Sequence, residues 1–493
     1  MTARGPARHD CTEAPRAARR YRATMWFPMI LTMTGALVVP PAAAAQREAA
    51  GDTIKAALAR GDHAGALAAL RPLIAQCEVA DAGESRCLAM ILLASDLATM
   101  AGDLTGGERF ARRGLVIAEQ HSGPDTPETA AALTQLGISL HRLARFADAE
   151  AAFRRALDIR SRMLAPGDRR IAIAAMNLAL TLGERGELIE AEGLLNRARA
   201  QLSRSPGDDP ASGTILTALG LNLSMQGRYA EAEAPLREAL DIRARTLPAT
   251  HPLVAAAYVN LGHCLIGLKR GRDAVTYFRR GLAGLEASLA PDHPDVIGGY
   301  LNLGSALGLE RDDAGAEAAY REVLNRAARS LPPNHPYIAN TKLALGIQYR
   351  EQRRLAEAQT MLASALAIFE AIYPADHPKI ASALLLLAMN DEELNRPEAA
   401  RRAYRRAYAI LASTPPWSRG RIAGFLTIAA HYRRTSDAPA VARTLSAAAA
   451  QGVLARLPTI GADSAAAQAD LRAFRPVFVE QVRAAWTLSS AAR

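Results

Sequence analysis

The dipeptide His-Pro recurs at a fixed interval, and this interval restricts the fold more than any other feature of the chain. Its copies begin at residues 251, 293, 335 and 377, each 42 residues after the one before. A Leu-Gly or Leu-Ala pair keeps the same interval, apart from one step of 41 residues. The leucines of these pairs are Leu136, Leu178, Leu219, Leu261, Leu303, Leu345 and Leu387. Self-similarity at this period is typical of a repeat array rather than of separate globular domains.

Each unit contains two amphipathic helical stripes, as the unit after the first His-Pro shows. Tyr258, Gly262 and Leu265 lie at helical spacing, and Ala274 and Phe278 follow on a second stripe after a polar break. Helix axes only about 8 to 10 Å apart leave no room for large side chains at a crossing, which explains the small residues. We expect Phe278 to fill the space between the helices. The equivalent large residues are Phe153, Leu195, Leu236, Tyr320, Leu362 and Tyr404.

The proline of each His-Pro suits the first position of a helix, where its missing N–H would be unpaired anyway. A single helix pair would leave one apolar face in water, so neighbouring units must stack to bury it. The composition agrees, because half of the residues are apolar although only 5% are aromatic. Such an Ala- and Leu-rich chain favours closely packed helices over strands.

The 42-residue period, the Asn-His-Pro and Asp-His-Pro loops and the Asn-Leu-Gly segments resemble the tetratricopeptide repeat (TPR) family, and within it the kinesin-light-chain subgroup. The resemblance implies an all-α fold, a right-handed superhelical solenoid of antiparallel helix pairs. It is specific for the fold and says little about function.

The repeat pattern also divides the chain. We expect seven repeats over residues 129–412, a degenerate repeat at 86–128 and another at 413–460. N-terminal helices at 46–85 would form a partial repeat, and a helix at 461–493 would close the array. The single 41-residue step, between the units of Leu178 and Leu219, predicts a shortened connection there.

The first 45 residues have the order of a secretory signal. An arginine-rich stretch at 16–22 precedes an uncharged run at 25–39, two prolines and the alanines 42–45. Cleavage after Ala45 would make the protein periplasmic or secreted. One alternative is an uncleaved anchor in the inner membrane, because the uncharged run reaches about 20 residues. Another is that the chain truly starts at Met25, which would remove the positively charged part of the signal.

Whether the cysteines are expected to form a disulfide depends on the signal assignment. In an exported protein, Cys77 and Cys87 could form a disulfide between two predicted helices. The alternative is a pair of unbridged small apolar residues. We expect Cys264 to be a buried thiol.

A candidate ligand face follows from helical geometry. Asn260 lies two positions before Gly262, about 200° around the helix, and therefore points away from the helix crossing. The TPR resemblance implies that asparagines of this column grip a bound peptide backbone, a role we assign to Asn177, Asn260 and Asn302. Neighbouring polar candidates for peptide binding are His263, Asn340 and Arg350. The alternative is that these side chains are simply solvated or cap a helix.

Several classes of function are disfavoured. The formal net charge is +10, but the arginines are scattered beside acidic residues, which does not suit nucleic-acid binding. The histidines of the His-Pro loops would lie at least one helix spacing apart, too far to share a zinc ion. No phosphate-binding loop, zinc-protease motif or nucleophile elbow is present. We therefore expect no metal, no cofactor and no enzymatic activity.

These features predict a non-catalytic scaffold or adaptor whose concave groove binds a peptide or protein segment. One alternative is a structural subunit of a periplasmic or membrane-associated assembly. A cytoplasmic regulatory TPR scaffold is the other, and it requires that the leader is not a signal. Contact with a membrane is expected only if the leader stays uncleaved.

Overall fold

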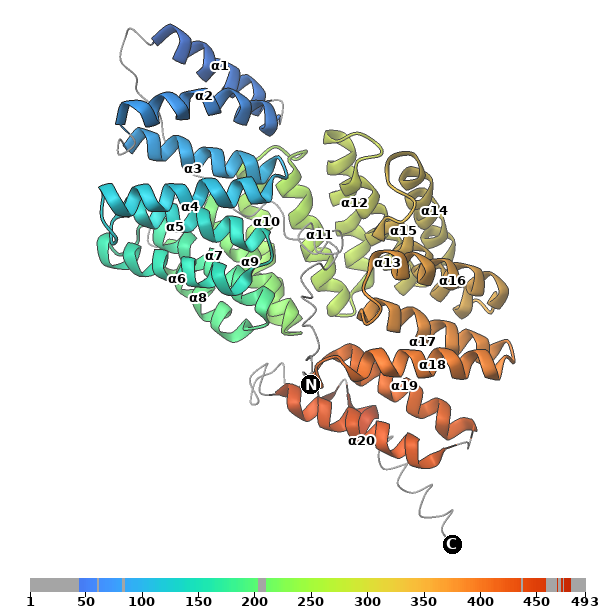
Figure 1. The fold of residues 1–493 in the computed structure, drawn as a ribbon. Coiled ribbons are helices and arrows are strands. Elements are labelled where there is room, and N and C mark those ends of the chain that lie inside the picture. The colour runs from blue at the N-terminus through green and yellow to red at the C-terminus, as the bar shows by residue number, and fades with distance from the viewer. Residues whose placement is uncertain are drawn as a thin grey trace, which may run out of the picture. The chain divides into compact units, whose positions relative to one another are not determined.

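The computed structural model describes residues 44–59, 62–81, 85–202, 210–435 and 438–457, with 468, 471–472 and 474–479. Every regular element in these residues is a helix (Figure 1). The helices are α1 (Ala44–Ala59), α2 (His63–Asp81), α3 (Ser85–Met100), α4 (Leu104–His121), α5 (Pro127–Arg142), α6 (Phe146–Met163), α7 (Arg169–Arg185), α8 (Leu188–Leu202), α9 (Pro210–Met225), α10 (Tyr229–Thr246), α11 (Pro252–Gly267), α12 (Gly271–Ser288), α13 (Pro294–Leu309), α14 (Asp313–Ser330), α15 (Pro336–Glu351), α16 (Leu355–Ile372), α17 (Pro378–Glu393), α18 (Pro397–Ala412), α19 (Arg419–Thr435) and α20 (Pro439–Arg456).

From α3 onward the odd-numbered helix of each pair, the first helix, packs along the even-numbered second helix that follows it. The helices fall into two compact units, α15–α18 and the remainder, which are considered separately. Within each unit, every second helix also packs against the next first helix, as α4 does against α5 and α16 against α17. The all-α solenoid of antiparallel helix pairs predicted from the sequence is confirmed.

Glycines at the helix crossings allow this close packing. A Cβ atom on Gly262 would lie 2.6 Å from the ring of Phe278, which is closer than two carbon atoms can approach. Gly137 faces Phe153 at the same distance. The equivalent contacts are Gly304 with Tyr320 and Gly346 with Leu362. The sequence predicts that a small residue of the first helix faces a large residue of the second, and these four crossings confirm it.

The turn between the two helices repeats one backbone conformation. One residue of the turn, the second after the first helix ends in all turns but that of Gly186, has a positive φ, between 57° and 89° in eight successive repeats. These residues are Gly102, Ala144, Gly186, Gly227, Lys269, Arg311, Arg353 and Asn395. This left-handed conformation ends the first helix and reverses the chain within three residues, at a cost of about 1 kcal/mol where the residue carries a Cβ.

The histidines of the His-Pro loops cap the helices that follow them. The Nδ1 atom of His251 accepts a hydrogen bond from the backbone N–H of Leu253 at 3.1 Å. His293, His335 and His377 cap their helices in the same way, at 3.1 to 3.2 Å. Asp168 takes the equivalent place before α7. The recurring histidine thus serves the start of each first helix, a role that needs no metal.

Ion pairs connect successive second helices. Arg145, which precedes α6, lies 2.7 Å from Glu108 on α4 and 2.6 Å from Asp148 in its own helix. Arg270 repeats this arrangement with Glu233 at 2.8 Å and Asp273 at 2.6 Å. Each pair is partly exposed and contributes little on its own, but the network is repeated along the array.

Several predicted segments fall outside the described residues. The leader at 1–45 does so except for its last two residues, which begin α1. Most of the capping helix predicted at 461–493 also does, and Val477 is buried in its described part. The connection that the 41-residue step was expected to shorten, residues 203–209, is likewise outside. Before it, α8 has 15 residues where α6 and α10 have 18.

Among the described helices, α16 alone has the length and composition that could cross a membrane. It packs between α15 and α17, and Leu362, Ala365 and Phe369 are fully buried there. These residues lie on one stripe of α16, and 22% of the apolar window is buried.

We expect His251→Ala to lower the free energy of unfolding by about 1 kcal/mol, because the N–H of Leu253 loses its acceptor. His251→Asp is the matched control, since Asp168 already caps α7. Denaturant unfolding followed by circular dichroism measures both variants. An equal loss in both would show that the imidazole acts through packing instead of through its Nδ1 atom.

Candidate peptide-binding face

The first helices form a continuous row. Within the unit of α1–α14, α3 contacts α5, α7 contacts α9 and α11 contacts α13, in addition to their own second helices. Consecutive second helices make no comparable contact among the described residues. The first helices are therefore the more tightly packed row, and they carry the predicted asparagine column.

Asn177 on α7 is the unusual member of this column. Only 3% of the residue is exposed, yet neither Oδ1 nor Nδ2 has a hydrogen-bond partner in the part of the chain that the structure describes. A buried amide without partners costs about 1–3 kcal/mol per polar atom. The amide of Asn177 therefore lacks, within the described residues, the hydrogen bonds that a buried amide normally makes.

The remaining column positions differ in exposure. Asn260 on α11 and Asn302 on α13 are half-buried, and Ala218 on α9 is buried. In the other unit, Ala344 and Leu386 are half-buried. The column therefore offers asparagines at three repeats, a buried glutamine, Gln135, on α5, and apolar side chains at the other positions.

A hydrogen-bonded chain lies beside Asn177. The hydroxyl of Thr181 donates to the backbone oxygen of Asn177 at 3.0 Å, and its oxygen lies 3.1 Å from Nδ1 of His141. Because the hydroxyl proton is already used, Nδ1 of His141 must donate, which assigns the tautomer. Burial, with a smaller contribution from the charge of Arg142, lowers the pKa of His141 to about 4. His141 is therefore neutral at pH 7.

His263 on α11 is also a neutral, mostly buried ring. Its Nε2 has no partner among the described residues, and the ring meets Phe278 edge-on at 5.2 Å. Burial lowers its pKa to about 4. His263 thus lies on the packing side of its helix, which weakens its predicted role in peptide binding.

Two opposite charges lie at the α3–α5 end of this face. Burial raises the pKa of Asp96, and a hydrogen bond from Gln135 and the charge of Arg142 oppose that shift. Burial lowers the pKa of Arg142 to about 10, with Asp96 opposing. Sequence reasoning did not select Asp96, because the degenerate repeat at 86–128 lacks the pattern that aligns it with the others.

The two candidates in the unit of α15–α18 already have partners. Oδ1 of Asn340 accepts a hydrogen bond from Nζ of Lys379 at 2.8 Å. Nε of Arg350 lies 3.0 Å from Glu393. Both contacts join neighbouring repeats, so these side chains have less capacity for a ligand than Asn177 has.

The cysteines lie as follows. A disulfide joins Cys77 on α2 to Cys87 on α3, with Cα atoms 5.7 Å apart. Cys264 is buried, its thiol donates to the backbone oxygen of Tyr229 at 3.2 Å, and burial raises its pKa to about 11. Cys264 is therefore the buried, unreactive thiol that the sequence predicts.

The buried histidines predict a loss of stability in mild acid. Between pH 6.5 and 4 the unfolded chain binds a proton at His263 and the folded chain does not, so the free energy of unfolding falls as the pH falls. At pH 5 this amounts to as much as about 2 kcal/mol. Urea unfolding at pH 7 and pH 5 should show a smaller loss for His263→Gln than for the wild type. His121→Gln, at an exposed position on α4, is the control and should keep the full loss.

Comparison with known proteins places this fold. No curated protein matches the chain. Among solved structures, apo RapI is 14% identical, with a TM-score of 0.54 over 74% of this chain and 97% of that one. The apo quorum sensor NprR from B. thuringiensis is 15% identical, with a TM-score of 0.54 over 75% and 99%. BtubC (BKLC) from P. vanneervenii is 22% identical, with a TM-score of 0.40 over 46% and 91%.

The family itself is shown by the repeats. The tetratricopeptide repeat family model matches residues 85–162, 170–245, 253–329 and 337–413, each match spanning two helix pairs. These matches cover more than half of the chain and include the glycine crossings and the histidine-capped helices described above. The chain belongs to the tetratricopeptide repeat family.

Proposed function

We propose that this protein is a non-catalytic scaffold that holds an extended segment of a partner protein along the first helices α5–α13. The observation that carries the proposal is the amide of Asn177, which is buried and has no partner in the described residues. A side-chain amide both donates and accepts, so it can bind the N–H and C=O of one peptide unit. The C=O and N–H groups of a bound peptide would supply the two hydrogen bonds that the amide of Asn177 lacks among the described residues.

The surroundings support a neutral backbone as the ligand. His141 is uncharged at pH 7, and Asn260 and Asn302 repeat the amide of Asn177 two and three repeats further along. Main-chain hydrogen bonds give affinity with little dependence on sequence, and side-chain pockets add specificity.

We expect Asn177→Leu to leave the thermal unfolding midpoint unchanged or to raise it. The variant removes two buried polar atoms that have no partner and keeps the volume of the side chain, which is neutral or favourable. Scanning calorimetry on the free protein measures this. A midpoint several degrees lower would mean that the amide has a structural partner, and the proposal would then lose its main support.

The same column should determine partner binding. Replacing Asn177, Asn260 and Asn302 by alanine should weaken the Kd for a partner, identified by crosslinking in the native cell, by about ten-fold or more. Asn196→Ala with Asn325→Ala, on the exposed faces of α8 and α14, is the matched control. Unchanged affinity in the triple variant would instead favour a structural subunit that binds through another surface.

We also propose that the protein is exported. The arrangement of residues 1–45 supports this, as does the bridge between Cys77 and Cys87, because such bridges persist in oxidising compartments. The mature chain should begin at Gln46 and, when unfolded in denaturant, present one reactive thiol, that of Cys264. Reduction should raise the count to three. N-terminal sequencing and thiol titration measure both, and an intact Met1 in the cytoplasm would contradict export.

A further inference from the structure

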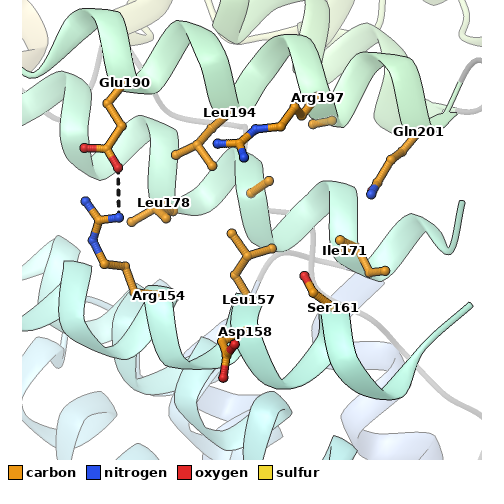
Figure 2. A pocket seen from close by; sticks show the side chains of 12 residues that line it. Arg154, Leu157, Asp158, Ser161, Ile171, Leu178, Glu190, Leu194, Arg197 and Gln201 are labelled. Carbon is orange, nitrogen blue, oxygen red and sulfur yellow. Dashed lines mark ion pairs between the residues drawn. The ribbon is translucent and has the colours of Figure 1, made fainter. Parts of the chain in front are cut away.

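A groove of about 380 Å³ lies between the second helices α6 and α8, above the first helix α7 (Figure 2). Its apolar lining includes Leu157, Leu178 and Leu194, one from each helix. At one end, Arg154 pairs with Glu190 at 2.8 Å. Towards the other end, Figure 2 shows Arg197 and Gln201 on α8 across from Ser161 on α6. The groove opens between second helices, whereas the asparagine column lies on first helices, and α7 contributes residues to both.

The neighbouring repeats show why the floor of this groove is open. Ala175 on α7 is aligned with Leu133 on α5 and with Leu216 on α9, both of which are buried. The next two first helices carry Tyr258 and Tyr300 at this position. Large side chains therefore occupy the gap in the adjoining repeats, and alanine leaves it vacant in this one.

The wall of the groove departs from the repeat as well. Gln201 on α8 is aligned with Ile159 on α6 and Ile242 on α10, which are buried in the apolar clusters that contain Leu133 and Leu216. The Oε1 atom of Gln201 is buried and has no partner among the described residues. A second large apolar side chain is thus replaced by a polar one with an unused acceptor.

A third departure removes a carboxylate. In the gap between α4 and α6, Arg155 lies 2.6 Å from Glu119 and donates to the backbone oxygen of Pro124 at 2.9 Å. Arg197 is aligned with Arg155, but Ser161 stands where Glu119 would be. Arg197 instead donates to a carbonyl of its own helix at 3.3 Å. The arginine is kept and its acidic partner is lost.

We propose that this groove is a docking site for a partner-protein segment that carries an aliphatic side chain next to a carboxylate. The aliphatic side chain takes the volume that Leu133 and Ile159 fill one repeat earlier, over Leu157 and Leu194. The carboxylate takes the place of the missing acid and forms an ion pair with Arg197. This site is additional to the peptide-binding face and does not depend on it.

The charges set the direction in which the segment lies. Glu190 is already paired with Arg154, and the strong hydrogen bond from Arg154 lowers the pKa of Glu190. Asp158 is paired with Arg162 at 2.7 Å. Arg197 makes no ion pair among the described residues, although its charge also helps to lower the pKa of Glu190. The acid of the segment would pair with Arg197 on the side where Ser161 stands in place of an acid. An adjacent hydroxyl and the amide of Gln201 can bind the remaining polar atoms.

The array itself supplies variants that close the groove. Ala175→Leu with Gln201→Ile restores the side chains of the flanking repeats and should fill the floor. Ser161→Glu restores the ion pair that Arg155 makes with Glu119. Because both changes copy contacts that already exist one repeat away, the thermal unfolding midpoint should stay the same or rise. Ser288→Glu, at an exposed position on α12, is the matched control for added charge.

The test uses an array of random twelve-residue peptides probed with the purified protein. Peptides captured by the wild type but lost with Ser161→Glu should be enriched in Leu, Ile or Val beside Asp or Glu. For the best peptide, fluorescence anisotropy should give a Kd about ten-fold weaker or more with Ser161→Glu, with the filled variant, and after its acid is changed to the amide. Asn177→Ala and Ser288→Glu should leave this Kd unchanged.

Any of four other results would overturn the proposal. Equal capture by the wild type and by both closed variants would mean that peptides bind elsewhere. Binding that survives the change from acid to amide would remove the role of Arg197. Self-association in sedimentation velocity that disappears with Ser161→Glu, without any peptide specific to the groove, would make a second copy of the chain the occupant. Loss of binding with Asn177→Ala alone would assign the peptide to the first-helix face.

Discussion

The contact between a glycine of the first helix and a large side chain of the second underlies the rest of this structure. At Gly262 and Phe278 even one methyl group would bring carbon atoms within 2.6 Å. The close approach fixes the spacing of the two helices, and the same contact recurs in the following repeats. The asparagine column inherits its position from the same contact, because Asn260 lies two residues before Gly262 and therefore points away from the crossing.

Periodic features could be predicted from the sequence because each is a local requirement repeated many times. The crossings, the buried ring of Phe278 and the stacking of helix pairs all followed from spacing alone. The contacts of Asn340 and Arg350 could not be predicted, because their partners Lys379 and Glu393 lie a whole repeat away on the same face. Spacing indicates which face a residue occupies, but whether its polar atoms are already satisfied depends on longer side chains from the neighbouring repeat.

The absence of a partner for Asn177 could not be predicted from spacing either. The sequence placed it in one column with Asn260 and Asn302, and nothing in the pattern separates the three. Only the packing around α7, which contacts α5 and α9 as well as α8, buries Asn177 and leaves its amide without a partner among the described residues. The strength of a candidate in a repeat array therefore depends on its local packing density, which composition and period do not specify.

Neighbouring repeats pack in the same way, so the residues in one gap between second helices can be compared with the aligned residues in the next gap. Between α4 and α6 the gap is filled by Leu133 and Ile159 and joined by Arg155 to Glu119. In the following gap the three matching changes remove volume, an apolar wall and a carboxylate, while the arginine stays. Random drift in a packed gap should lower stability at each step. Three such changes lie in one groove, and the cation Arg197 is kept there. They are better explained if a partner supplies the apolar volume and the carboxylate that this repeat lacks.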